Sequence, residues 1–150
     1  MKKAEKPERE SALDGVPRAL PALMRAEALQ KKARRVGFDW PDVRGSLDKV
    51  REEVAEVTKE IESDLAFAAA NEAKFSPAPE TAEELGDLLF SIVNLTRHLK
   101  LDAEELLTGA NDKFARRFRA VEARIKASGK TMTECTLEEL DAAWNEVKAG

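Results

Sequence analysis

Apolar residues recur along much of this chain at steps of three and four, the spacing of one face of an α-helix. The clearest stretch, expected to be helical from about Ser46 to Ala70, has a seam suited to packing in a helical bundle: Leu47, Val50, Val54, Val57, Ile61 and Leu65. Runs that alternate apolar and polar residues between turns, as strands do, are missing from the sequence. The pattern therefore predicts an all-α protein.

Start and stop signals predict the other helices of the bundle. Gly37 is suited to cap the first helix, and a loop from Phe38 to Gly45 follows it. The spacing of a capping box opens the later helices at Thr81 with Glu84, Asp102 with Glu105, and Thr136 with Glu139. We expect helices over about 17–36, 46–70, 81–99 and 102–129, and a short one from 136. Together they predict a helical bundle of about five helices with a four-helix core.

Composition narrows the class of protein. The 150 residues are 36% charged and 43% hydrophobic, so the chain is rich in charge yet apolar enough to fold. Residues 1–13 contain little to bury, and we expect a flexible arm there and a single domain over 14–150. A net charge of −4 argues against a broad basic surface for nucleic acid.

Cysteine and hydropathy indicate the compartment. Cys135 is the only cysteine, which excludes an intrachain disulfide and a cysteine-based zinc site. The charged first ten residues precede no apolar segment of a signal peptide, and no stretch of about 18 apolar residues could span a membrane. We therefore expect a cytoplasmic protein that does not bind membranes.

Two pairs of carboxylates lie on the second and third expected helices. Glu53 with Glu56, and Glu84 with Asp87, are each three residues apart and so share one helix face. Antiparallel packing would bring the pairs together, and four carboxylates repel one another unless a cation lies among them. An all-oxygen set without His or Cys suits Mg²⁺, with Mn²⁺ as the alternative.

The ordinary interpretation of such pairs is a solvated helix face, and it is favoured for the 46–70 helix taken alone. The 81–99 helix argues for metal, because apolar residues cover most of its circumference. We expect this helix to be buried, where Glu84 and Asp87 would need a partner or an ion. A capping role for Glu84 competes with this interpretation.

A polar stripe continues along the same face of the 81–99 helix through Ser91, Asn94 and His98. Satisfied hydrogen bonds between helices are the favoured interpretation for Asn94 and His98, and contact with a substrate is the alternative.

Basic and aromatic residues supply candidate substrate contacts. Lys113 and Arg117 lie one helical turn apart and could hold phosphates, or they could form a solvated basic face. Lys49 could pair with Glu53 or reach a phosphate. Trp144 is more often a plug of the core in such a position than a platform for a base.

These residues lie within longer motifs that resemble a known family. The run Lys49-Val-Arg-Glu-Glu-Val-Ala-Glu56, followed by Glu83-Glu-Leu-Gly-Asp-Leu-Leu-Phe90, resembles the paired Glu-Glu-x-x-Glu and Glu-x-x-Asp motifs of MazG-type all-α nucleoside triphosphate pyrophosphohydrolases. Val36-Gly-Phe-Asp-Trp40, Val93-Asn-Leu-Thr-Arg-His-Leu99 and Ala110-Asn-Asp-Lys-Phe-Ala-Arg-Arg-Phe118 agree with it. The resemblance runs from about Ser11 to Lys148.

The resemblance implies an enzyme that uses Mg²⁺ to cleave a nucleoside triphosphate between the α and β phosphates, giving the monophosphate and pyrophosphate. It assigns Glu53, Glu56, Glu84 and Asp87 to the metal. It assigns Lys49, Lys113 and Arg117 to the phosphates and Trp144 to the nucleotide. It also implies a homodimer or larger homo-oligomer with sites near the subunit interface. Two features depart from the family: many relatives have two such domains in tandem, and the 65–80 connection looks long.

The reaction requires a group that accepts the proton of the attacking water. Glu52 is the candidate general base, because it is adjacent in sequence to the ligand Glu53 but does not share the helix face of the ligands. Two rival functions remain open. One is an all-α relative selective for a single base, like a dUTPase or dCTPase. The other is a non-catalytic helical interaction module with a structural Mg²⁺.

Overall fold

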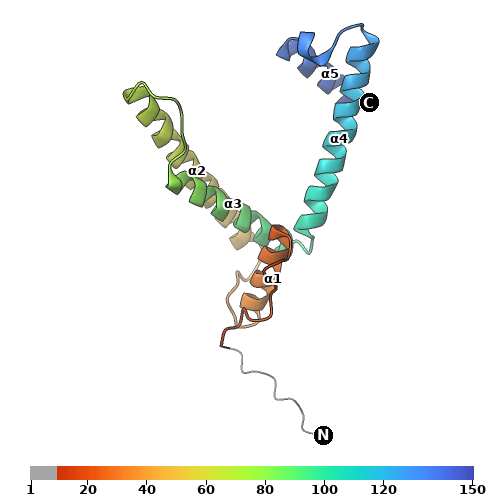
Figure 1. The fold of residues 1–150 in the computed structure, drawn as a ribbon. Coiled ribbons are helices and arrows are strands. Elements are labelled where there is room, and N and C mark those ends of the chain that lie inside the picture. The colour runs from red at the N-terminus through yellow and green to blue at the C-terminus, as the bar shows by residue number, and fades with distance from the viewer. Residues whose placement is uncertain (1–9) are drawn as a thin grey trace. The chain divides into compact units, whose positions relative to one another are not determined.

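The computed structural model describes residues 10–150, which form only helices and connections (Figure 1). The elements are α1 (Ala22–Arg34), α2 (Val43–Ala70), α3 (Pro79–His98), α4 (Ala103–Ala127), the 3₁₀ turn η1 (Met132–Glu134) and α5 (Leu137–Ala149). No strand occurs among the described residues, which confirms the all-α prediction. None of these helices is long and apolar enough to cross a membrane. The first nine residues of the predicted arm lie outside the described part.

The described residues fall into two compact units, divided after Ala103. In the first unit α2 and α3 pack side by side, and α1 packs against α3 (Figure 1). In the second unit Val121 and Ile125 of α4 and Ala143 of α5 form a small buried cluster. A single domain over 14–150 and a four-helix core that includes α4 stay predictions.

The first helix is shorter than expected, since α1 begins at Ala22 and not near Pro17. Pro21 explains the difference, because a proline disfavours helical backbone at the residue before it. The end agrees with the prediction: Gly37 has a φ of +87°, and the Phe38 N–H donates to the Ala33 carbonyl at 3.1 Å. This is the closing bond of a Schellman cap, which a left-handed glycine permits.

The start of α2 also differs from the prediction. The helix begins at Val43 and not near Ser46, because the Asp42 carboxylate accepts the Arg44 N–H at 2.8 Å and caps it. At the other end α2 continues to Ala70, so the connection to α3 is residues 71–78 and is shorter than the predicted one.

The capping box predicted at Thr81 and Glu84 is wrong. The helix α3 begins at Pro79, which lacks an N–H and therefore suits the first helical position. A carboxylate from α2 caps it: Asp64 Oδ2 accepts the Ala78 N–H at 3.2 Å and the Thr81 hydroxyl at 2.6 Å. The box predicted for α5 is confirmed, because the Thr136 hydroxyl accepts the Glu139 N–H at 3.2 Å.

The surface between α2 and α3 is more polar than the sequence predicts. Of the predicted α2 seam only Val57 is buried, while Leu47, Val54 and Leu65 are exposed. The expectation that α3 is buried is wrong for the described chain, since Leu85, Leu89, Ile92 and Leu99 are exposed. The buried side chains of these two helices include Ser46, Glu53, Asp64, Thr81, Ser91 and Arg97. The first unit thus has polar residues inside and an uncovered apolar face.

Candidate functional site

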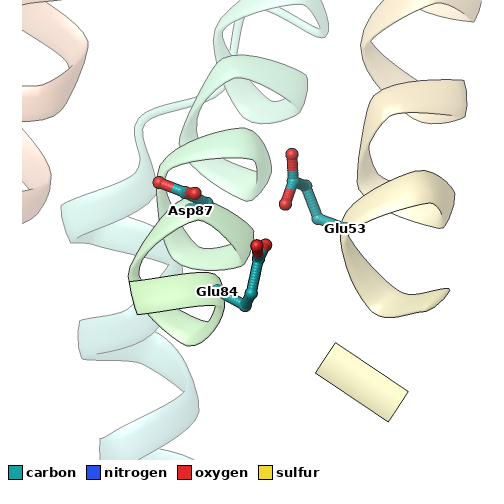
Figure 2. A group of neighbouring side chains, drawn as sticks. All are labelled: Glu53, Glu84 and Asp87. Carbon is teal, nitrogen blue, oxygen red and sulfur yellow. The ribbon is translucent and has the colours of Figure 1, made fainter. Parts of the chain in front are cut away.

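Three of the four predicted metal ligands meet between α2 and α3. Figure 2 shows Glu53 of α2 facing Glu84 and Asp87 of α3, and one carboxylate oxygen from each lies within 4.8 Å of the others. Glu53 is buried, Glu84 is half-buried and Asp87 is exposed. The site is thus closed on the α2 side and open beside Asp87.

The three carboxylates of this cluster lie close enough to repel one another when they are ionised. Burial raises the pKa of Glu84, and the charges of Glu53, Asp87 and Glu56 raise this pKa further. A cation placed among the oxygens would relieve the repulsion. Because the donors are carboxylate oxygens without His or Cys, the set fits a hard divalent ion such as Mg²⁺ or Mn²⁺.

Lys49 offsets part of this charge. Its Nζ lies 2.8 Å from Oε1 of Glu53 and 3.3 Å from Oε1 of Glu52. The hydrogen bond to Glu53 raises the pKa of Lys49 above its ordinary value, despite burial, which lowers it. Pairing with Glu53, one of the two predicted roles of Lys49, is therefore confirmed, and contact with phosphate stays a prediction. The Glu52 side chain is 63% exposed, as expected for a residue off the ligand face.

The remaining predicted site residues lie outside the group of three carboxylates. Glu56 is exposed one turn further along α2, and although its charge acts on Glu84, its role as a ligand stays a prediction. In the second unit, Lys113 is exposed and Arg117 is half-buried on α4. Their contact with phosphate also stays a prediction.

Trp144 packs in the core of the second unit. It is half-buried against the Val121 cluster, and its ring centroid lies 5.6 Å from that of Phe114. The prediction that it plugs the core is confirmed. Its contact with a nucleotide stays a prediction.

A cavity of about 700 Å³ adjoins the carboxylates within the first unit. Glu53 and Asp87 form part of its wall, so the candidate metal site opens into it. The rest of the wall combines apolar and aromatic side chains with a few polar ones, the usual make-up of a small-molecule site. These include Leu29, Gln30, Phe38, Asp39, Trp40, Lys49, Phe90, Ser91, Asn94 and Arg97.

An ion pair fixes the loop at the rim of this cavity. The Arg97 guanidinium of α3 donates to both oxygens of Asp39, at 3.0 and 2.6 Å, and to Oδ1 of Asn94 at 2.5 Å. Burial raises the pKa of Asp39, but the hydrogen bonds and charge of Arg97, with the charge of His98, outweigh it and lower this pKa below its ordinary value. The loop is therefore tied to α3 through a bidentate contact.

Two further contacts hold Trp40 in this loop. His98 places Nε2 3.2 Å from the Trp40 carbonyl and Nδ1 3.1 Å from the Asn94 carbonyl. Gly45 of α2 lies so close to the indole that a Cβ there would be 3.1 Å from Trp40. Asn94 and His98 thus have hydrogen-bond partners, as the favoured interpretation predicts, but these partners lie within α3 and in the loop and not on another helix. Contact of Asn94 and His98 with a substrate stays a prediction.

Sequence reasoning missed three polar residues of the cavity wall, namely Gln30, Asp39 and Arg97. It also did not assign the aromatic wall residues Phe38, Trp40 and Phe90 to the site. Arg97 carried a usable signal, since a charged residue inside an apolar helix needs a partner if it is buried. Asp39 and Gln30 carried none, because their partners lie 58 and 60 residues away.

Comparisons with known proteins agree with this geometry. The MazG nucleotide pyrophosphohydrolase domain matches residues 44–121, which include the three clustered carboxylates. The nucleoside triphosphate pyrophosphohydrolase of Escherichia coli K12 is 48% identical over 92% of this chain and 49% of its own length. The nucleoside triphosphate pyrophosphohydrolase/pyrophosphatase MazG of Thermotoga maritima is 40% identical over 87% of this chain and 46% of its own.

This chain spans about half the length of these two relatives. The matched domain nevertheless covers more than half of the chain. It includes both acidic motifs, whose carboxylates α2 and α3 bring together in one site. The chain belongs to the MazG nucleotide pyrophosphohydrolase domain family.

Proposed function

We propose that this chain hydrolyses nucleoside triphosphates between the α and β phosphates, with Mg²⁺ held by Glu53, Glu84 and Asp87. The observation that carries the proposal is the meeting of these three carboxylates at the wall of a cavity of about 700 Å³. The similarity to the nucleoside triphosphate pyrophosphohydrolases of Escherichia coli and Thermotoga maritima supports the same reaction. Glu56, one turn beyond Glu53, completes the proposed ligand set.

In this reaction the oxygen of a water molecule bonds to the α phosphorus, and the electrons of the bridging P–O bond leave with pyrophosphate. A divalent cation bound there would neutralise phosphate charge and stabilise the charge that develops on the leaving group. Glu53, Glu84 and Asp87 would hold this cation, and their close approach before it binds would limit the reorganisation that the reaction needs.

Glu52 is the proposed acceptor of the proton that the water loses. Its carboxylate is exposed and lies 3.3 Å from Lys49 Nζ, which also contacts the ligand Glu53. The contact keeps Glu52 beside the cluster without using it as a ligand. Lys49, Lys113 and Arg117 are proposed to bind the phosphates, and Trp144 is proposed to contact the nucleotide.

We further propose a homodimer or larger homo-oligomer. Exposed apolar side chains occur on α3 at 85, 89 and 92, and at Leu99, the C-cap of this helix. They recur at steps of three, four and seven, which is the spacing of a helix-packing stripe. A monomer rarely leaves such a stripe uncovered. Removal of unwanted nucleotides from a cytoplasmic pool is the proposed cellular use of the activity.

The test is a panel of ribo- and deoxyribonucleoside triphosphates incubated with the protein and Mg²⁺, with detection of pyrophosphate and monophosphate. Glu53→Gln and Asp87→Asn should abolish turnover, whereas Glu62→Gln, at an exposed position of α2, should not. Turnover of one base alone would favour the base-selective rival. No product from any triphosphate would favour the non-catalytic module.

A further inference from the structure

One buried polar atom in the cavity wall has no partner. Gln30, the one buried residue within α1, is 6% exposed and lines the cavity, and its Oε1 accepts no hydrogen bond from the described residues. Leaving a buried acceptor unsatisfied is costly. Such an atom in a cavity wall therefore indicates a ligand that donates to it.

The orientation of the Gln30 amide is set by α3. Its Nε2 donates to the Phe90 carbonyl at 3.0 Å. Turning the amide over would place Oε1 against that carbonyl oxygen, and two acceptors cannot bond to each other. Oε1 is thus fixed as an acceptor, and the ligand must supply an N–H or O–H.

The surroundings of Gln30 favour a flat, partly apolar ligand. Phe38, Trp40 and Phe90 line the same cavity and are 81%, 44% and 48% exposed. Exposed rings around a buried polar atom suit the stacking of a heteroaromatic ring whose edge carries polar groups. Because Glu53 and Asp87 lie in the same wall, a triphosphate held by a cation on these acids can place its base in this cavity.

We propose that the cavity holds the nucleobase of the substrate and that Gln30 Oε1 accepts a hydrogen bond from an N–H of that base. This inference rests on the proposed function and adds a residue that determines base selectivity. The donor is either an exocyclic amino group or a ring N–H, and the test separates the two.

The experiment compares kcat/KM within pairs of triphosphates that differ by one donor. ATP with purine riboside triphosphate, and CTP with pyrimidin-2-one riboside triphosphate, test an amino group. UTP with N3-methyl-UTP tests a ring N–H. We expect the wild-type protein to prefer the member with the donor by roughly 10- to 100-fold in at least one pair.

Gln30→Met removes the acceptor and keeps an unbranched side chain of similar length. It should bring that preference to within about threefold, mainly by slowing the member with the donor. Glu62→Met, at an exposed position of α2 outside the cavity, is the comparison variant, expected to leave the preference unchanged. An absent preference in the wild-type protein, an equal loss of both members in Gln30→Met, or the same loss of preference in Glu62→Met would overturn the proposal.

Failure of the proposed function would look different, since no triphosphate would then be cleaved. Calorimetric titration with adenosine and purine riboside, and with the other nucleoside pairs, would in that case test the pocket without metal or phosphates. Tighter binding of the donor-bearing nucleoside, lost in Gln30→Met, supports the base contact. Equal binding within every pair, or none, overturns it.

Discussion

Replacing Arg97 by methionine is the substitution we expect to affect the first unit most. The Arg97 side chain is 6% exposed and that of its partner Asp39 is 13% exposed, so the ion pair is nearly dry. Methionine retains the apolar stem and removes the guanidinium. Asp39 would then remain a half-buried carboxylate without its two charged hydrogen bonds.

The expected cost follows from this burial. Removing one partner of a fully buried ion pair costs about 3–5 kcal/mol, because the other charge is left without compensation. Two features reduce the cost here: Asp39 retains some exposure, and Arg97 Nε donates to no described group. We therefore expect Arg97→Met to lower the free energy of unfolding by about 2–4 kcal/mol, and the unfolding midpoint by on the order of 10 °C.

Urea unfolding followed by circular dichroism measures this loss. Arg51→Met is the matched control, because Arg51 pairs with Asp48 on the surface of the same unit, with both side chains about 70% exposed. The control should cost less than about 1 kcal/mol. If both variants lost the same stability, the Asp39–Arg97 pair would not be what holds the loop on α3.

The pH dependence supplies an independent check. Because the folded-state pKa of Asp39 is lowered, its stabilising contribution is complete above the unfolded-state pKa of about 3.9 and is lost as the pH falls through the lower folded value. Asp39→Asn should therefore lose more stability at pH 7 than at pH 3. An equal loss at both values would mean that the charge of Asp39 contributes nothing.

Three further substitutions test the acidic cluster, the cap of α3 and the apolar face. Mg²⁺ should raise the unfolding temperature of the wild-type protein, and Asp87→Asn should abolish this rise without lowering the temperature measured in EDTA, because one of three like charges is gone. An unchanged Mg²⁺ effect in thermal scans would contradict this. Asp64→Ala should cost about 2–3 kcal/mol in urea unfolding, since it leaves the Ala78 N–H and the Thr81 hydroxyl unpaired; a loss below about 0.5 kcal/mol would refute that role. Leu89 is 59% exposed, and Leu89→Glu should convert an oligomer into a monomer of 16.6 kDa, as measured by sedimentation velocity. A wild-type protein that already sediments as a monomer would refute the proposed oligomer.

The helices could be predicted from the sequence because their signals are local. Periodicity together with local start and stop signals located all five, and the cap at Gly37 and the start of α5 are where short-range patterns indicate them. Two of the three errors in helix starts arose where a proline or a distant residue decides the boundary, whereas the Asp42 cap of α2 is a local signal that the prediction missed. Pro21 delays α1, and Asp64, 17 residues before Thr81, replaces the capping box expected at α3.

The carboxylates of the candidate site could likewise be predicted from local spacing, whereas the cavity wall could not. A spacing of three residues places Glu84 and Asp87 on one face of α3, and antiparallel packing of α2 and α3 then delivers Glu53 to them. The cavity wall could not be predicted, because its polar contacts join α1 or the loop after it to α3. Only the fold brings Gln30 to Phe90 and Asp39 to Arg97.

In the first unit several polar side chains are buried while many apolar side chains are exposed, and this arrangement connects the site to oligomer assembly. A helix pair that buries Glu53, Asp64 and Arg97 gives up part of the hydrophobic stabilisation that its own leucines and valines would supply if they were inside. The same apolar residues remain exposed on α2 and α3 at helix-packing spacing. A partner that covered them would stabilise the helices that carry the carboxylates, whose mutual repulsion opposes folding. Weakening that face should therefore also weaken the proposed binding of Mg²⁺, although none of its residues belongs to the proposed ligand set.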